Sequence, residues 1–182
     1  LAGLAEKFVE VSMIGVTDAE GRFRVSSEAS HTALDATGRD YFTAHRDALV
    51  QGMYFSAPFV GRVSGTRQFA ISLARRDSEG RFDGVVFASV SLGYFERFWE
   101  QVIPSAGYLI PLMREDGTLL LRYPTVDVPP QLNPNGPFVQ RVQAARHGLY
   151  RAVSLVDGVE RINAYRQVHN YPLYISFSIP TA

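Results

Sequence analysis

The chain has 182 residues, of which 46% are hydrophobic and 12% aromatic, so it can bury a sizeable core as one large domain or two small ones. Eighteen Lys and Arg residues balance eighteen Asp and Glu residues, and a neutral chain without a basic stripe argues against nucleic acid as the partner. The sequence contains no cysteine, which excludes disulfides, Cys-ligated zinc and thiol catalysis.

The N-terminal part predicts a helix followed by a hairpin. Apolar residues recur at helical spacing over the first ten residues. This helix either covers one side of a sheet or ends a longer helix that arrives from a membrane anchor. Residues 12–17 and 22–26 predict two strands, because the Asp-Ala-Glu-Gly segment between them supplies a turn. Residues 27–37 predict a loop, and residues 40–48 predict one or two helical turns.

The next part predicts a small antiparallel sheet. Residues 53–60 indicate a strand in which Pro58 marks an edge or a bulge. Residues 66–75 alternate between large and small side chains. The large ones are Phe69, Ile71 and Leu73, and the small ones are Ala70, Ser72 and Ala74. We expect the large face to pack against a helix and the small face to leave room for a ligand. A returning strand at 82–90 and an aromatic amphipathic helix at 92–102 follow.

The second half of the chain repeats this order. Gly117 closes an acidic turn between strands at 108–113 and 118–123, as Gly21 does in the first half. A proline-containing loop at 125–137 and a helix at 138–146 follow. Three strands then complete the unit, at 149–155, 160–168 and 173–179. The repetition predicts an α+β fold of two tandem modules, each a five-stranded antiparallel sheet flanked by helices, after the N-terminal amphipathic helix.

Five ordered segments carry a family resemblance, which is strongest over residues 38–99. The segments are Gly38-Arg-Asp-Tyr-Phe42 with His45 and Arg46, Phe55-Ser-x-Pro-x-Val-Gly-Arg62 with Ser64-Gly65, Ile71-Ser-Leu-Ala-Arg-Arg76, Gly80-Arg-Phe-Asp-Gly-Val-Val86, and Ala88-Ser-Val-x-Leu-x-Tyr-Phe95. The ordered set resembles the extracytoplasmic double-Cache sensor domains of bacterial transmembrane receptors, also described as tandem PAS-like or PDC-type domains.

The resemblance implies a domain organisation and a location. Residues 1–10 would end a stalk helix, residues 11–103 would form the membrane-distal, ligand-binding module, and residues 104–182 the membrane-proximal module. The chain would lie in the periplasm, be joined to the inner membrane by flanking helices, and form a homodimer within the full-length receptor. The cytoplasmic output would be a diguanylate cyclase, a phosphodiesterase, a histidine kinase or a chemoreceptor signalling region.

By the same resemblance, the ligand lies between the first sheet and the helix-loop layer above it. The residues that we expect to line this pocket are Tyr41, His45, Arg46, Tyr54, Ser56, Ser72, Arg75 and Ser89. Because a guanidinium binds a carboxylate through two parallel hydrogen bonds, the expected ligand is small and anionic. The amino-acid-binding pattern of the family, with Arg and Trp close together on one strand, is absent, which argues against an amino acid.

Other polar residues have simpler interpretations. Arg39 and Asp40 are interpreted as a local ion pair or a helix cap, and Arg62, which follows a turn glycine, as an exposed side chain. In the second module, four residues could line a second pocket, although this module is often unoccupied in the family. They are Tyr108, Arg122, Arg161 and Tyr165.

Catalysis is not supported by the sequence. The four histidines are scattered without metal-site spacing, and neither a Gly-x-Ser-x-Gly elbow nor a glycine-rich phosphate loop is present. We therefore expect neither an enzyme nor a cofactor or metal. Two alternatives to a receptor sensor remain: a soluble binding or adhesion module without signalling, and a small hydrolase or isomerase.

Overall fold

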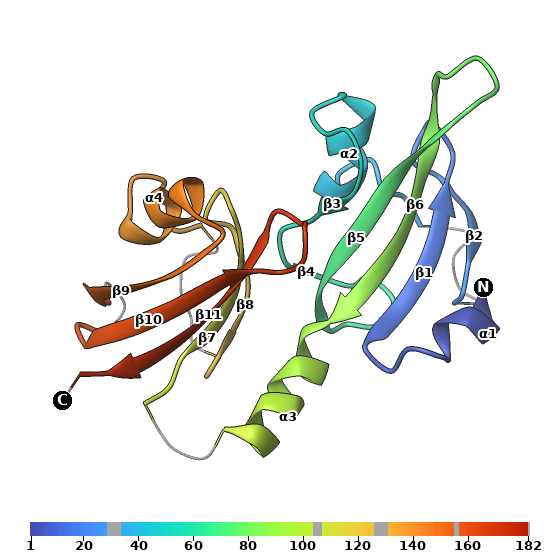
Figure 1. Ribbon diagram of the computed structural model, residues 1–182. Helices are drawn as coiled ribbons and strands as arrows, with labels where there is room; N and C mark the ends of the chain where they lie inside the picture. Colours follow the sequence, from blue (N-terminus) through green and yellow to red (C-terminus); the bar gives the residue numbers. More distant parts are fainter. Residues whose placement is uncertain (29–33, 104–106, 126–130, 155–156, 182) are drawn as a thin grey trace. The chain divides into compact units, whose positions relative to one another are not determined.

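The fold is described from a computed structural model that covers residues 1–28, 34–103, 107–125, 131–154 and 157–181. Parts of the two expected loops, at 27–37 and 125–137, and residue 155 of an expected strand lie outside these ranges. The chain divides into two compact units, Leu1–Phe95 and Glu96–Ala182. Each unit is built on one antiparallel sheet (Figure 1). None of the helices in the described ranges combines the length and the hydropathy needed to cross a bilayer.

The sheet of unit 1 has six strands in the order β2-β1-β6-β5-β3, and β4 also pairs with β5. The strands are β1 (Val11–Thr17), β2 (Phe23–Ser26), β3 (Tyr54–Phe55), β4 (Phe59–Val60), β5 (Arg67–Arg76) and β6 (Phe82–Ser91). The sixth strand corrects the expectation of five. It arises because the segment expected at 53–60 is interrupted at residues 56–58, where Pro58 lacks the N–H that a continuous ladder needs.

The core of unit 1 lies between this sheet and α2 (Asp40–Arg46), which packs against β5 and β6 (Figure 1). Tyr41 and Phe42 of α2 form one buried cluster with Ala70 on β5 and Phe87 on β6. The sequence predicts that the small-residue face of β5 leaves room for a ligand, and this prediction is wrong. The aromatic side chains of α2 cover that face. Leu73, on the face expected to lie under a helix, is 41% exposed. The small side chains make room for the helix and not for a ligand.

The expected N-terminal amphipathic helix is reduced to α1 (Ala2–Ala5), a single turn. Leu4 and Phe8, which should mark its buried face, are 47% and 46% exposed. A short helix without a covered apolar face has little to stabilise it, which explains its early end. In contrast, α3 (Leu92–Val102) spans the residues expected for it. The division between the two units falls inside α3, at residues 95/96, rather than at the expected 103/104.

Unit 2 repeats the topology of unit 1, with five strands in the order β8-β7-β11-β10-β9. Its elements are β7 (Ile110–Arg114), β8 (Leu119–Tyr123), α4 (Pro137–Ala144), β9 (His147–Val153), β10 (Glu160–Gln167) and β11 (Leu173–Pro180). In both units the last strand pairs with the first, and α4 packs its Phe138 and Val142 into the core as α2 does in unit 1. Gly21 and Gly117 close the equivalent turns at φ values of +85° and +88°, which favour glycine. The repeat predicted from the sequence is confirmed.

Candidate functional site

Unit 1 contains a cavity of about 190 Å³ at the end of the sheet where β4 and β5 pair. Its walls come from β1, from residues 34–41 and from residues 59–68. It is smaller than the pockets of about 300–1,000 Å³ that hold drug-sized ligands. The space therefore suits a small molecule.

Two guanidinium groups line this cavity, and each is held by a backbone carbonyl. Arg39 Nη2 donates to the carbonyl of Val60 at 3.2 Å, and the Arg39 Cζ lies 4.5 Å from the centre of the Phe59 ring, a cation–π contact. Arg62 Nη1 donates to the carbonyl of Asp35 at 2.8 Å. Among the described residues, no carboxylate lies within ion-pair distance of either guanidinium. Both groups therefore keep N–H donors that a ligand can use.

Gln68 adds an amide to the same wall. Gln68 is only 2% exposed. Its Oε1 accepts hydrogen bonds from the Ser12 hydroxyl at 2.7 Å and from the Ser64 hydroxyl at 3.5 Å. These two hydrogen bonds occupy the amide oxygen of Gln68. The Nε2 group donates to no residue in the described ranges, so it is a third source of N–H donors at the cavity.

The aromatic side chain of Tyr41 lines the cavity. The Tyr41 ring stacks on Phe87 with a centroid distance of 4.7 Å and lies 5.8 Å from the Phe59 ring. Burial raises the pKa of Tyr41 to about 12, against the opposing effect of the nearby positive charges of Arg39 and Arg62. The phenol thus stays neutral, and the site gains an apolar surface rather than a charge.

Carboxylates also reach the cavity. Asp35 accepts two hydrogen bonds of 2.5 Å from Thr37, one from the backbone N–H and one from the hydroxyl, and these bonds hold the pKa of Asp35 below its ordinary value. Glu28 is a second acidic residue in the lining. The cavity thus combines two guanidinium groups with two carboxyl groups.

Comparison with known proteins identifies the family. A sequence profile of the dCache_1-like family, described as a histidine kinase sensor domain, matches residues 92–178. The extracellular domain of rpHK1S-Z16, a protein assigned as a histidine kinase, is 30% identical, with a TM-score of 0.84 over 99% of this chain and 75% of that one. This chain belongs to the double-Cache-like family of sensor domains. The resemblance seen in the sequence is confirmed, and the chain is an extracytoplasmic sensor module.

More distant solved structures share the fold of this double-Cache domain. The ligand-binding domain of the Pseudomonas aeruginosa PAO1 amino-acid chemoreceptor PctB, in complex with L-Arg, is 16% identical with a TM-score of 0.62, over 98% of this chain and 74% of that one. The sensor domain of the V. cholerae histidine kinase DctB is also 16% identical, with a TM-score of 0.57 over 100% of this chain and 76% of that one. No curated protein sequence matched the chain.

In this double-Cache domain, Tyr41 is the one residue of the eight expected contacts that lines the described cavity. His45 and Ser72 lie in the core, where their side chains bond to each other at 3.0 Å. Arg46 is exposed and pairs with Asp47 at 2.7 Å. These positions differ from the expected ones because the buried face of α2 packs directly on the sheet.

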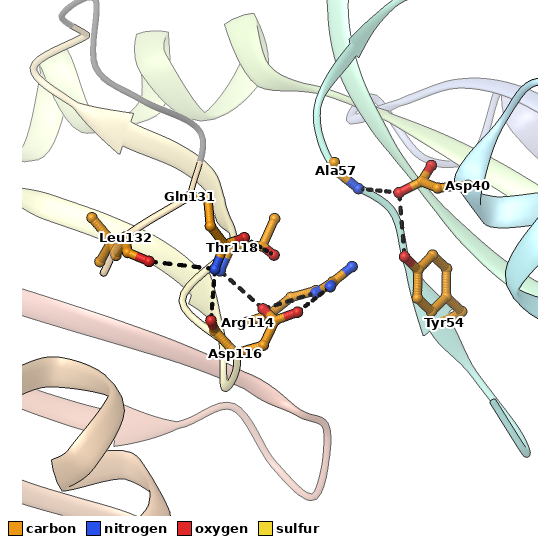
Figure 2. Close-up of polar contacts among 8 residues, drawn as sticks. All are labelled: Asp40, Tyr54, Ala57, Arg114, Asp116, Thr118, Gln131 and Leu132. Atoms are coloured by element: carbon orange, nitrogen blue, oxygen red, sulfur yellow. Dashed lines mark hydrogen bonds and ion pairs between the residues drawn. The ribbon is translucent and has the colours of Figure 1, made fainter. Parts of the chain in front are cut away.

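Tyr54 and Arg75 form contacts within the fold. The Tyr54 hydroxyl donates to Asp40 Oδ2 at 3.3 Å, and the same oxygen accepts from the backbone N–H of Ala57 at 2.6 Å (Figure 2). Asp40 thus fixes the interrupted strand to α2. Arg75 pairs with Asp83 at 2.6 Å and donates to the carbonyl of Thr17 at 2.9 Å.

Ser56 and Ser89 are both fully buried, with different surroundings. The Ser56 hydroxyl accepts from the Ala70 N–H and donates to the Ala57 carbonyl, both at 2.8 Å, and so completes the ladder where β3 stops. The Ser89 hydroxyl has no partner among the described residues. Neither serine lines the cavity.

The interpretation of the sequence missed Arg39, Arg62 and Gln68. Arg62 is exposed, as the sequence predicts for a residue after a turn glycine, but the sequence does not indicate that it lines a cavity. For Arg39 the sequence predicts a local ion pair or a helix cap. One signal was available for Gln68, because it precedes Ala70 and Ser72 by two and four residues and so shares their inward face. A polar side chain on a buried face needs partners, and such a residue is a candidate for a site.

Proposed function

We propose that unit 1 of this double-Cache domain binds a small carboxylate in the cavity formed by Arg39, Arg62 and Gln68. The observation that supports this proposal is the concentration of N–H donors on one cavity, where two guanidinium groups lack a carboxylate partner within the described residues. A carboxylate can accept two parallel hydrogen bonds from one guanidinium and a further bond from the second. The volume of about 190 Å³ limits the ligand to a small molecule.

A second candidate ligand is a small zwitterion such as an α-amino acid. Asp35 and Glu28 favour it, because their carboxylates could bind an ammonium group while the arginines bind the carboxylate. The domains of PctB and of Pseudomonas fluorescens CtaA were solved with L-Gln and with L-serine, respectively. The absent Arg-Trp strand pattern argues against an amino acid, so the simple carboxylate remains our first choice.

Ligand binding would act as a signal by favouring one of two arrangements of the sensor. We propose that the change passes through flanking membrane helices to a cytoplasmic diguanylate cyclase, phosphodiesterase or histidine kinase, in a homodimeric receptor. The family membership supports this role, since the family profile describes a histidine kinase sensor domain. A soluble binding or adhesion module without signalling is the alternative, and it would be favoured by a full-length gene that encodes no membrane helix and no output domain.

A thermal-shift screen tests the proposed ligand class. The probes are acetate, malonate, succinate and lactate, with L-alanine and L-serine as zwitterions and ethylamine as the cationic control. A ligand at 100 times its Kd adds about 2.7 kcal/mol to the free energy of unfolding, which should raise the Tm by several degrees in a domain of this size.

The variant Arg62→Gln keeps the hydrogen-bonding side chain but removes the charge. We expect it to lose the Tm response to the carboxylate hit. Its matched control is Arg81→Gln, since Arg81 is exposed and pairs with Asp77 outside the cavity lining. A wild-type protein that responds to none of the carboxylates or amino acids contradicts the proposal, as does a full response in Arg62→Gln.

A further inference from the structure

Unit 2 contains a larger cavity of about 420 Å³, between the inner face of its sheet and the segment that leads into α4. Its walls are mainly apolar and include Met113, Leu119, Leu132, Phe138 and Ala152. Met113, Leu119 and Phe138 also belong to the buried core of this unit. The cavity is therefore an extension of the core that the described side chains do not fill, and it offers an apolar environment to a ligand.

Arg161 places a buried polar group in this apolar wall. Its side chain is 6% exposed, and its Nη1 and Nη2 each donate to Asp157 at 2.7 Å. The Nε–H is buried and has no partner among the described residues. A buried donor without an acceptor is unfavourable, and an oxygen atom of a ligand would satisfy it.

Arg122 is a second cation in the same lining. Its Nη1 donates to the carbonyl of Pro124 at 2.9 Å, and it forms no ion pair with another described residue. Burial lowers the pKa of Arg122, Asp157 opposes this effect, and the positive charge of Arg161 adds to it. The described residues that line the cavity thus include two guanidinium groups and no carboxylate, which leaves an excess of positive charge in the lining.

Several of the other polar groups nearby already form hydrogen bonds within the unit. The Ser178 hydroxyl donates to Asn163 Oδ1 at 2.6 Å, and the Asn163 amide donates to the carbonyl of Arg161 at 3.1 Å. Of the four residues expected to line a second pocket, Tyr165 donates instead to the carbonyl of Arg141, and Tyr108 stacks on Phe177. The two arginines therefore remain as the groups that can select a ligand by charge.

We propose that unit 2 binds a second ligand, an amphipathic monocarboxylate. Its carboxylate accepts hydrogen bonds from Arg161 and Arg122, and its aliphatic or aromatic body fills the space beside Leu132 and Phe138. This ligand is larger and more apolar than the one proposed for unit 1, because the cavity is about 420 Å³ rather than about 190 Å³ and its walls are mostly hydrocarbon.

Isothermal titration calorimetry with hexanoate on the 182-residue protein tests this proposal. Hexanamide, which has the same chain without the charge, is the comparison probe. We expect hexanoate to bind one site per chain, and hexanamide to bind at least tenfold more weakly. No heat of binding for hexanoate at millimolar concentration would overturn the proposal, and equal affinities would overturn the role of the arginines.

Three variants locate the site. Ala152→Leu, opposite Arg161 in the pairing of β9 with β10, fills part of the cavity and leaves both charges in place. Arg122→Gln removes one charge. Each variant should weaken hexanoate binding at least tenfold. Arg62→Gln, in the cavity of unit 1, should leave it unchanged. Loss of binding in Arg62→Gln with retention in Ala152→Leu would place the ligand in unit 1 and overturn the proposal. Undiminished hexanoate binding by Arg122→Gln would also overturn the proposal.

The hexanoate test of unit 2 can succeed or fail independently of the carboxylate screen that tests the proposed function of unit 1. The Tm of each variant without ligand shows whether it folds, and if Ala152→Leu fails to fold, Arg122→Gln carries the test. Small carboxylates that bind through Arg62 establish the site in unit 1 whatever hexanoate does. Hexanoate that binds through Arg122 establishes the site in unit 2 even if the screen on unit 1 finds no ligand.

Discussion

The Nε2 atom of His45 on α2 lies 3.0 Å from the hydroxyl oxygen of Ser72 on β5, and this hydroxyl donates in turn to the carbonyl of Tyr41 at 3.0 Å. Because a hydroxyl carries one proton, Ser72 accepts from His45, and the hydrogen of the neutral imidazole must be on Nε2. Nδ1 is buried and has no partner among the described residues. A second proton on this ring would therefore point at no described acceptor.

This geometry predicts a fall in stability at mildly acidic pH. Burial lowers the pKa of His45; the hydrogen bond to Ser72 opposes this effect, and the nearby positive charge of Arg76 adds to it. Since the unfolded chain binds the proton more readily than the native state, the free energy of unfolding should decrease as the pH falls below about 6.5, by at most about 1.4 kcal/mol per pH unit. Urea denaturation between pH 7.5 and 5 measures the slope.

The variant His45→Gln should flatten this slope, because its side chain does not titrate. His147→Gln is the control, since His147 is exposed at the start of β9, and it should retain the wild-type slope. If His45→Gln and the wild-type protein lose stability in parallel between pH 7.5 and 5, the assigned role of His45 is wrong.

Two buried serines should respond to alanine in opposite ways. Ser56→Ala removes the acceptor of the Ala70 N–H and should destabilise the domain by about 1–3 kcal/mol. Ser89→Ala removes a hydroxyl that has no partner among the described residues, and should be neutral or slightly stabilising. Equilibrium denaturation of the two variants gives the comparison. A large destabilisation by Ser89→Ala would show that its hydroxyl has a partner after all.

Gly84 should tolerate no side chain. It lies in β6 at φ +107°, and a Cβ atom there would meet the carbonyl oxygen of Thr17 and lie 2.7 Å from the backbone of Asp18. Backbone strain alone costs about 1–3 kcal/mol, and the collision adds to it, so Gly84→Ala should lower the Tm by several degrees. Gly38→Ala is the matched control, because a Cβ atom at Gly38 meets nothing within 4 Å. Equal Tm values for both variants would contradict this account.

The two arginines at the ends of the 39–46 segment should differ in their effect on ligand binding. Arg39→Gln removes a guanidinium from the unit 1 cavity and should abolish most of the Tm increase produced by the carboxylate found in the screen. Arg46→Gln removes an exposed guanidinium that pairs with Asp47 and should leave that increase intact. The reverse result would restore Arg46 as a ligand contact and remove Arg39 from the site.

Much of the fold could be predicted from the sequence because the signals are local. The turn glycines at 21 and 117 and the aromatic periodicity of residues 92–102 depend only on neighbouring residues. These signals locate most of the strands, α3 and the internal repeat. The first helix failed because helical spacing alone does not supply a surface on which Leu4 and Phe8 could be buried.

The sequence alone determined the module type, the repeated topology and the presence of cationic residues over 38–76. Only the tertiary structure decided which of them share a cavity. The pairing of β4 with β5 and the return of residues 34–41 bring Arg39, Arg62 and Gln68 together. The packing of α2 places His45 in the core and leaves Arg46 in solvent. Which side chain faces a cavity depends on the contacts between distant segments, and a one-residue step along a helix turns the side chain by about 100°.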